Sequence, residues 1–223
     1  MAEIVVAIDG PAGSGKSSVS KQLARQLGYA YLDTGAAYRA LAWATLNGLD
    51  SAKLESGDFE EDFDYQISTD PDDFWVRVGG TDVTEAIRSS LISESVSSVA
   101  KISNVRSFMK RLTRSIVSAS SLDGAIVEGR DITTVVFPDA DSRILLTASE
   151  EVRLQRRSAE ISASSTNAVV NQVTKRDASD SKIVDFMNAA EGVTLVDSSD
   201  LNFEQTVEVM SAQIEADLKA RKQ

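Results

Sequence analysis

The sequence predicts an α/β fold: a P-loop, doubly wound, parallel five-stranded sheet with helices on both faces, plus a small α+β insertion and a lid. Apolar runs such as Ile4 to Ile8 and Ala125 to Val127 are typical of strands buried on both faces of a parallel sheet. Segments with helical spacing of apolar residues alternate with such runs. A glycine-rich loop stands directly between the first strand and the first helix.

That loop reads GPAGSGKSS and fills the phosphate-loop motif. Small residues let successive backbone N–H groups turn around phosphate oxygens at the start of a helix. The pattern predicts that Lys16 bridges the β- and γ-phosphates of a nucleoside triphosphate and that Ser17 binds magnesium. A turn that merely closes a strand–helix unit is the alternative, and the complete match disfavours it. The expected ATP-binding residues are Gly10, Pro11, Ala12, Gly13, Ser14, Gly15, Lys16, Ser17 and Ser18.

Composition restricts the function. The chain has 223 residues, a net charge of −11, and neither cysteine nor histidine. The negative charge argues against broad nucleic-acid binding, because neutralising phosphates needs a basic surface. Disulfides and cysteine- or histidine-dependent catalysis are excluded, whereas phosphoryl transfer relies on Lys, Arg and magnesium. No signal peptide or membrane span is expected, so the prediction is a cytoplasmic enzyme.

The first half of the chain continues with a helix to Gly28, a short strand at 29–32 and an apolar helix to Leu46, for which Thr34 is the expected N-cap. Arg39 on that helix is either a snorkelling surface charge or an anion clamp. Residues 51–63 are acidic and suggest loop or irregular helix. Alternating strands then flank Gly79-Gly80, a hairpin signal, and this small antiparallel sheet marks the insertion.

Two helices are expected at 87–100 and 105–119. The second carries Arg106, Lys110 and Arg114 on one face, for which a solvated surface is the usual interpretation. Arg130 and Asp131 follow a buried strand at its carboxyl end, where parallel sheets bind ligands.

The remaining segments are a strand at 142–147, a helix from Ala148, a final strand at 194–196 and a closing helix at 203–220. Arg153, Arg156 and Arg157 form a cationic cluster on the helix from Ala148 and invite an anionic ligand. Residues 158–174 are polar and suggest a mobile flap.

Four stretches together resemble bacterial cytidylate kinase, a family of P-loop nucleoside monophosphate kinases. Their order and spacing cover nearly the whole chain, and the second and fourth are far more specific than the phosphate loop. They are GPAGSGKSS at 10–18, LDTGAAYRALA at 32–42, VTEAIRS at 83–89 and GRDITTVVFPDAD at 129–141.

The resemblance implies transfer of the ATP γ-phosphate to CMP or dCMP, giving CDP or dCDP, with Mg²⁺. It implies catalytic roles for Lys16, Arg130, Arg157 and Arg176, with Arg157 also at ATP. Arg39 and Arg130 look like clamps on the acceptor phosphate, and Arg153 falls near the lid, among cations that face the transferring group. The residues that the resemblance places at CMP are Thr34, Arg39, Ser97, Arg106, Arg130, Asp131, Arg176 and Asp180.

Three departures affect the lid and the loop after Asp131. Ile183 stands where the family pattern has an arginine, and Lys182 is a weaker substitute because it cannot bind two oxygens at once. Thr133 replaces a glycine that is usual after the Gly-Arg-Asp triplet, and the lid looks shortened.

One kinase domain is expected over residues 1–223, with the insertion at about 62–103 and the lid at about 155–180. The expected partners are ATP and CMP or dCMP, without nucleic acid or membrane, and nothing demands more than a monomer. Two alternatives remain: a P-loop kinase for another small acceptor, and a non-catalytic nucleotide-binding switch. The chain lacks the Asn-Lys-x-Asp motif with which such a switch would read guanine.

Overall fold

The structure is a computed structural model that describes residues 2–160 and 185–221. Its central sheet has five parallel strands in the order β2-β6-β1-β7-β8, which confirms the predicted fold class. The apolar first run therefore lies in the middle of the sheet. The strands are β1 Ile4–Asp9, β2 Ala30–Asp33, β6 Gly124–Gly129, β7 Ser142–Thr147 and β8 Thr194–Asp197.

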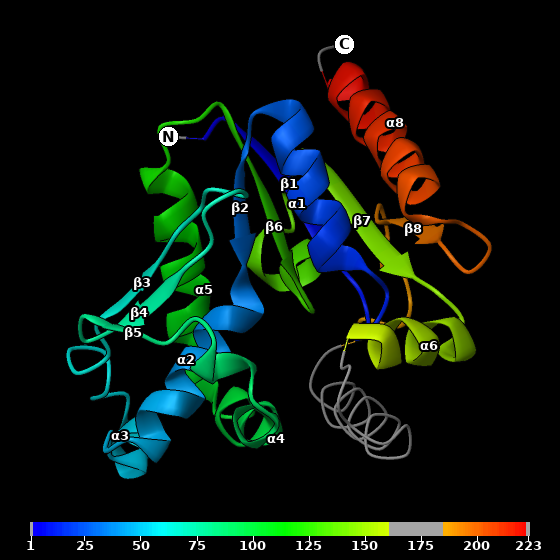
Figure 1. Ribbon diagram of the computed structural model, residues 1–223. Helices are drawn as coiled ribbons and strands as arrows, with labels where there is room; N and C mark the ends of the chain where they lie inside the picture. Colours follow the sequence, from blue (N-terminus) through cyan, green and yellow to red (C-terminus); the bar gives the residue numbers. More distant parts are fainter. Residues whose placement is uncertain (1, 161–184, 222–223) are drawn as a thin grey trace.

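Helices cover both faces of this sheet (Figure 1). On one face, α1 (Lys16–Leu27) and α8 (Phe203–Arg221) pack their apolar sides on β1, β6 and β7. On the other face lie α5 (Ser103–Ala119) and the short π-helix η2 (Ile132–Val136). The helix α6 (Glu150–Glu160) crosses near the carboxyl ends of the strands. These ends are therefore the edge where loops from different strands meet.

A second apolar core lies beside the sheet and joins the helix after β2 to the predicted insertion. Its antiparallel sheet has the order β3-β4-β5, and Gly79 and Gly80 form the hairpin with φ values of 54° and 76°. Both values favour glycine, as the hairpin prediction required. The elements here are α2 Thr34–Leu46, α3 Ser51–Ser56, β3 Tyr65–Ile67, β4 Val76–Val78, β5 Thr81–Asp82, the 3₁₀ turn η1 Ala86–Arg88 and α4 Ser90–Ala100.

Three local expectations need correction. The N-cap of α2 is Asp33, whose carboxylate accepts a hydrogen bond from the Ala36 N–H, and Thr34 is instead the first helical residue. The π-helix after Asp131 was not foreseen, since five residues of mixed β-branched type gave no helical signal. Residues 158–160, assigned to the flap, still belong to α6.

Part of the lid lies outside the described residues. Arg176, Asp180, Lys182 and Ile183 all fall in the range 161–184, so their expected roles remain predictions. Within the described ranges, every helix is too short or too polar to cross a membrane.

The π-helix is held to the central strand by Asp9, which is almost fully buried at the end of β1. Its carboxylate accepts hydrogen bonds from the N–H groups of Ile132 and Thr133, at 2.9 and 2.8 Å, and from the Thr133 hydroxyl at 2.6 Å. Burial raises the Asp9 pKa, and these hydrogen bonds counteract that effect. Thr133 therefore supplies a contact that a glycine at this position could not make.

We expect Asp9→Ala to lower the free energy of unfolding by about 2–4 kcal/mol, because three donors in the protein interior lose their acceptor. Denaturant unfolding followed by circular dichroism measures this change. The control is Asp50→Ala, which removes the exposed cap of α3 and should cost about 1 kcal/mol or less. Equal losses for both variants would contradict the anchoring role of Asp9.

Candidate active site

The glycine-rich loop leaves β1 and enters α1 at the carboxyl edge of the sheet. Gly13 and Gly15 both have left-handed backbone conformations, with φ values of 75° and 87°. A Cβ atom on Gly13 would lie 2.5 Å from the Arg153 carbonyl oxygen, so this position accommodates only glycine. The loop is thus packed directly against α6.

Three arginines from other elements hold the carbonyl groups of this loop. Arg130 donates to the Gly10 carbonyl at 2.9 Å, and Arg153 donates to the Ala12 carbonyl at 3.0 Å. Arg156 donates to the Ser14 carbonyl at 3.1 Å. A loop whose carbonyl groups are engaged in this way is suited to turn N–H groups toward an anion.

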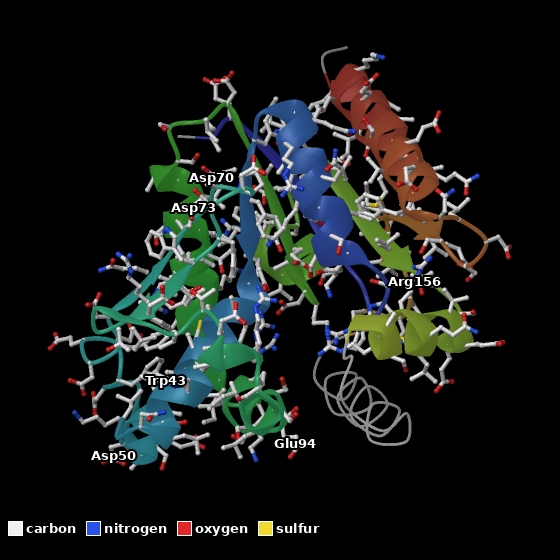
Figure 2. The ribbon with its side chains drawn as sticks, in the orientation of Figure 1. Trp43, Asp50, Asp70, Asp73, Glu94 and Arg156 are labelled. Atoms are coloured by element: carbon white, nitrogen blue, oxygen red, sulfur yellow. The ribbon has the colours of Figure 1, made fainter. Side chains whose placement is uncertain are left out.

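Arg156 lies between α6 and the loop, as Figure 2 shows. The same guanidinium also donates to the hydroxyl and carbonyl of Ser198, at 3.0 and 2.9 Å, and to the Leu201 carbonyl at 3.1 Å. It therefore ties the phosphate loop to the segment between β8 and α8. From the sequence Arg156 was only part of a cationic cluster, and this structural role was missed because its acceptors lie 42 to 142 positions away in the chain.

Arg153 is only 6 % exposed and holds the Ala12 carbonyl. It therefore supports the phosphate loop, and its expected place among the cations that face the transferring group stays a prediction. Arg157 is half-buried on α6, one residue after Arg156. Its predicted role at ATP stays a prediction.

The phosphate-loop lysine faces a buried carboxylate that the predictions did not include. Glu128, at the end of β6, is 1 % exposed, and its Oε2 atom lies 3.7 Å from Lys16 Nζ. Its Oε1 atom accepts a hydrogen bond from the Tyr31 hydroxyl at 2.5 Å, and the Ser17 hydroxyl also donates to this carboxylate. The signal for Glu128 was a single charged residue within an otherwise apolar strand.

Burial raises the pKa of the Glu128 carboxyl, while Lys16, Ser17 and Tyr31 oppose that shift. The nearby Asp33 carboxylate adds to it. Tyr31 has its pKa raised well above the usual value, first by burial and then by Glu128, and so remains a donor. Lys16 also lowers the pKa of Asp33, so its positive charge acts on both acids at the start of α1.

Asp33 is the second of these acids and also binds Arg39. Its Oδ2 atom lies 2.6 Å from Arg39 Nη2, and both side chains are mostly buried. Burial raises the Asp33 pKa, but the ion pair with Arg39 outweighs it and leaves the pKa lowered. Arg39 is therefore not a snorkelling surface charge. Without a phosphate present, its partner is a carboxylate from its own helix cap.

A cavity of about 300 Å³ opens between α2, α5 and the segment from Asp131 to Val136. Arg106 Nη2 lies 2.8 Å from Asp131 Oδ2 at this cavity. The two residues predicted to act together are thus adjacent, although 25 positions apart in sequence. Thr34, predicted for the same site, lines the cavity and donates to the Glu128 carbonyl at 2.8 Å.

The basic face of α5 is not the solvated surface that its spacing favoured. Arg106 and Lys110 line the cavity, and Arg114 donates to the Val136 carbonyl at 2.7 Å. Ser97, by contrast, lies half-buried on α4 and is not among the described residues that line the cavity. Arg130 points toward Gly10 and stacks on Phe186, with 4.3 Å between its guanidinium carbon and the ring centroid.

The donor set near the loop consists of hard oxygen atoms. The Ser17 hydroxyl is exposed and touches Glu128, which fits the oxygen ligands and extensive hydration of Mg²⁺. Among the described residues no cluster of three or more acidic, His or Cys side chains forms a metal cage. A magnesium ion would therefore depend on nucleotide phosphates for most of its ligands.

The site combines a glycine-rich anion loop, a lysine beside it, and a second cavity with a charged pair. Comparison with known proteins identifies the family to which a chain with this arrangement belongs. The family model described as cytidylate kinase matches residues 6–216. The chain belongs to the cytidylate kinase family.

Curated relatives agree with this assignment over nearly the full length. The cytidylate kinase of Streptomyces avermitilis is 41 % identical over 215 residues, covering 95 % of this chain and 93 % of the relative. That of Cutibacterium acnes is 41 % identical over 216 residues, covering 93 % and 94 %. The chain is therefore an enzyme of a nucleotide kinase family, as the motifs at 10–18 and 129–141 indicated.

Solved structures support the fold of this cytidylate kinase family member. A Thermus thermophilus protein superposes with a TM-score of 0.52 at 20 % identity, covering 98 % of this chain and 99 % of that one. A gluconokinase from Sinorhizobium meliloti gives 0.51 at 10 % identity, covering 99 % and 96 %. The shared architecture is the P-loop α/β sheet.

We expect Arg156→Lys to weaken ATP binding about tenfold, because lysine keeps the charge but cannot reach several carbonyl groups at once. Isothermal titration calorimetry with a non-hydrolysable ATP analogue measures the dissociation constant of each variant. Arg25→Lys is the matched control, since Arg25 makes its ion pair with Asp72 on the surface of the molecule. An unchanged affinity in Arg156→Lys would show that the other two arginines suffice to shape the loop.

Proposed function

We propose that the protein transfers the γ-phosphate of ATP to CMP or dCMP, giving CDP or dCDP. The observation that carries this proposal is the Arg106–Asp131 pair in a cavity lined by α2, α5 and the segment from Asp131 to Val136. Cytosine presents an N4 amino donor next to the N3 and O2 acceptors. A carboxylate and a guanidinium side by side are complementary to that edge.

The donor nucleotide binds at Gly10 to Ser18 in this proposal. Lys16 leaves the Glu128 carboxylate and reaches the β- and γ-phosphates, where negative charge is greatest. Glu128 and Asp33 then lie on the side of Lys16 away from the phosphates. Before ATP arrives, Glu128 pairs with the Lys16 ammonium group, which then exchanges this carboxylate for phosphate oxygens.

The acceptor phosphate lies near Arg39 and Arg130, at the carboxyl ends of β2 and β6. Arg39 exchanges its Asp33 partner for phosphate. Arg130 donates to the Gly10 carbonyl of the phosphate loop and thereby keeps the acceptor site adjacent to the ATP site. Thr34 contacts the nucleoside, and Ser97 joins it if α4 moves toward the cavity. Arg157, Arg176 and Asp180 complete the site from α6 and from the segment outside the described residues.

Magnesium bound to the nucleotide supplies charge neutralisation at the β- and γ-phosphates. Ser17 would hold it directly, with Glu128 as the acceptor that orients the Ser17 hydroxyl. We further propose that the enzyme acts in the cytoplasm and as a monomer.

A coupled assay with ATP and a panel of acceptors tests the proposal. We expect CMP and dCMP to be phosphorylated far faster than UMP, AMP or shikimate at neutral pH. Preferred phosphorylation of AMP or shikimate would favour a kinase for another small acceptor. Hydrolysis of nucleoside triphosphate without transfer to any acceptor would favour a nucleotide switch.

We expect Lys16→Met to lower kcat by several orders of magnitude, because the transferring phosphoryl group loses its main protein cation. Without Lys16, the pKa of Glu128 rises and its protonation limits the loss of stability. Steady-state kinetics and a thermal melt together measure both effects. Activity within about tenfold of wild type would refute the role of Lys16, since that loss is only about 1.4 kcal/mol of barrier.

Asp131→Ala should lower kcat/KM for CMP by about 10- to 100-fold and leave the KM for ATP nearly unchanged, because the N4 amino group loses its acceptor. Initial rates with each substrate varied in turn provide the measurement. The control is Asp139→Ala, which removes a carboxylate paired with Arg114 at the surface. If UMP and CMP lose activity equally, Asp131 does not read the base.

A further inference from the structure

The acceptor cavity contains a second cation, Lys110, for which the proposed reaction gives no role. Lys110 lies one turn after Arg106 on α5, is half-buried, and lines the same cavity as Asp131. Among the described residues no ion pair is recorded for it, whereas Arg111, the next residue, pairs with Glu60 at 2.5 Å on the surface. Lys110 is therefore placed to act on the cavity, and Arg111 is not.

The charged groups around Asp131 come from two packed elements. On α5 these are Arg106 and Lys110, and on β1 the buried Asp9 is a like charge. Arg130, which precedes Asp131 in the sequence, donates to the Gly10 carbonyl and stacks on the Phe186 ring. The remaining polar groups of the cavity wall are uncharged near neutral pH, and they belong to Thr34, Tyr38, Ser103, Ser107 and Thr113.

Burial and the neighbouring cations have opposite effects on the pKa of the Asp131 carboxyl. Burial raises its pKa, the ion pair and hydrogen bond with Arg106 lower it, and Lys110 lowers it further. The net result is a raised pKa for Asp131, so the two cations only partly offset the effect of burial. Asp131 therefore takes up a proton at a higher pH than an ordinary aspartate does.

The two protonation states of Asp131 favour different bases. An ionised carboxylate only accepts hydrogen bonds, and it suits the 4-amino group of cytosine. A protonated carboxyl carries a donor, which suits the 4-oxo group of uracil and leaves the cytosine amino group with a poorer acceptor. The N3 position inverts in the same sense, from an acceptor in cytosine to an N–H donor in uracil, and the carbonyl oxygen of a protonated carboxyl can accept from that N–H, whereas O2 accepts in both bases.

We propose that Lys110 is a specificity-determining residue that keeps Asp131 ionised and thereby favours CMP, and that UMP becomes a substrate when Asp131 is protonated. This inference rests on the proposed function, because it assigns the acceptor base to the same cavity. It extends the substrate class from cytosine monophosphates to pyrimidine monophosphates wherever Asp131 is protonated. Lys110 acts through Asp131 and is a positioning residue, not a catalytic one.

The test measures the ratio of kcat/KM for CMP to that for UMP as a function of pH. Titration of the acceptor phosphate is common to both substrates and cancels in the ratio, and the range is kept where neither base titrates. We expect the wild-type ratio to fall as the pH decreases through the pKa of Asp131. In Lys110→Met this fall should begin about half a pH unit higher, which reduces the ratio about threefold at a fixed pH within the transition.

Three further variants separate this mechanism from general effects of charge. Lys110→Arg should restore the wild-type profile, and Arg111→Met should leave it unchanged although it removes the same charge one residue away. Asp131→Asn should give a low ratio that does not vary with pH, because an amide presents a donor at every pH. Equal shifts in Lys110→Met and Arg111→Met would overturn the assignment to Lys110.

The inference and the proposed function fail in distinguishable ways. If CMP is phosphorylated but the wild-type ratio does not change with pH, the protonation of Asp131 does not control the base. If neither pyrimidine monophosphate is phosphorylated, the proposed function itself is wrong.

Discussion

The arrangement of the site depends on one constraint: a charge removed from water must be paired. The carboxyl ends of β1, β2 and β6, together with the residues that follow them, bring Asp9, Asp33, Glu128 and Asp131 out of contact with most solvent. Each has a different kind of partner. Backbone N–H groups bind Asp9, a guanidinium binds Asp33, a lysine and a phenol bind Glu128, and a second guanidinium binds Asp131. An acidic edge can therefore bind anions, because its own negative charges are already paired.

The arginines at this edge divide into two kinds, and their partners show the division. Arg153 binds the Ala12 carbonyl and Arg156 binds carbonyl and hydroxyl groups, so both shape the loop. Arg39 and Arg106 bind carboxylates, which an incoming phosphate or base can replace or share. Net charge is a poor guide to such a site, since a chain of −11 still concentrates cations where phosphates are expected.

The sequence was sufficient for the sheet, the phosphate loop, the hairpin and the Arg106–Asp131 pair, because each has a local pattern or a family motif. It was insufficient for Glu128 and Tyr31, whose contact joins positions 97 apart in the chain. The choice between Asp33 and Thr34 as helix cap depended on one residue of register, which propensities do not resolve. The contact of Arg153 with the Ala12 carbonyl was not predicted, because a cation on a helix looks the same in sequence whether it binds a phosphate or a backbone carbonyl.

The helix α5 belongs to two packed bodies at once. Val105 and Met109 in its first half lie in the core beside the sheet, whereas Val117 in its last turn lies in the core on the sheet itself. Arg106 thus lies on the half of α5 that packs in the first core, while Asp131 precedes Ile132, which is buried in the second. The ion pair between them therefore links the two cores, and the relative position of its two side chains depends on how these cores pack against each other.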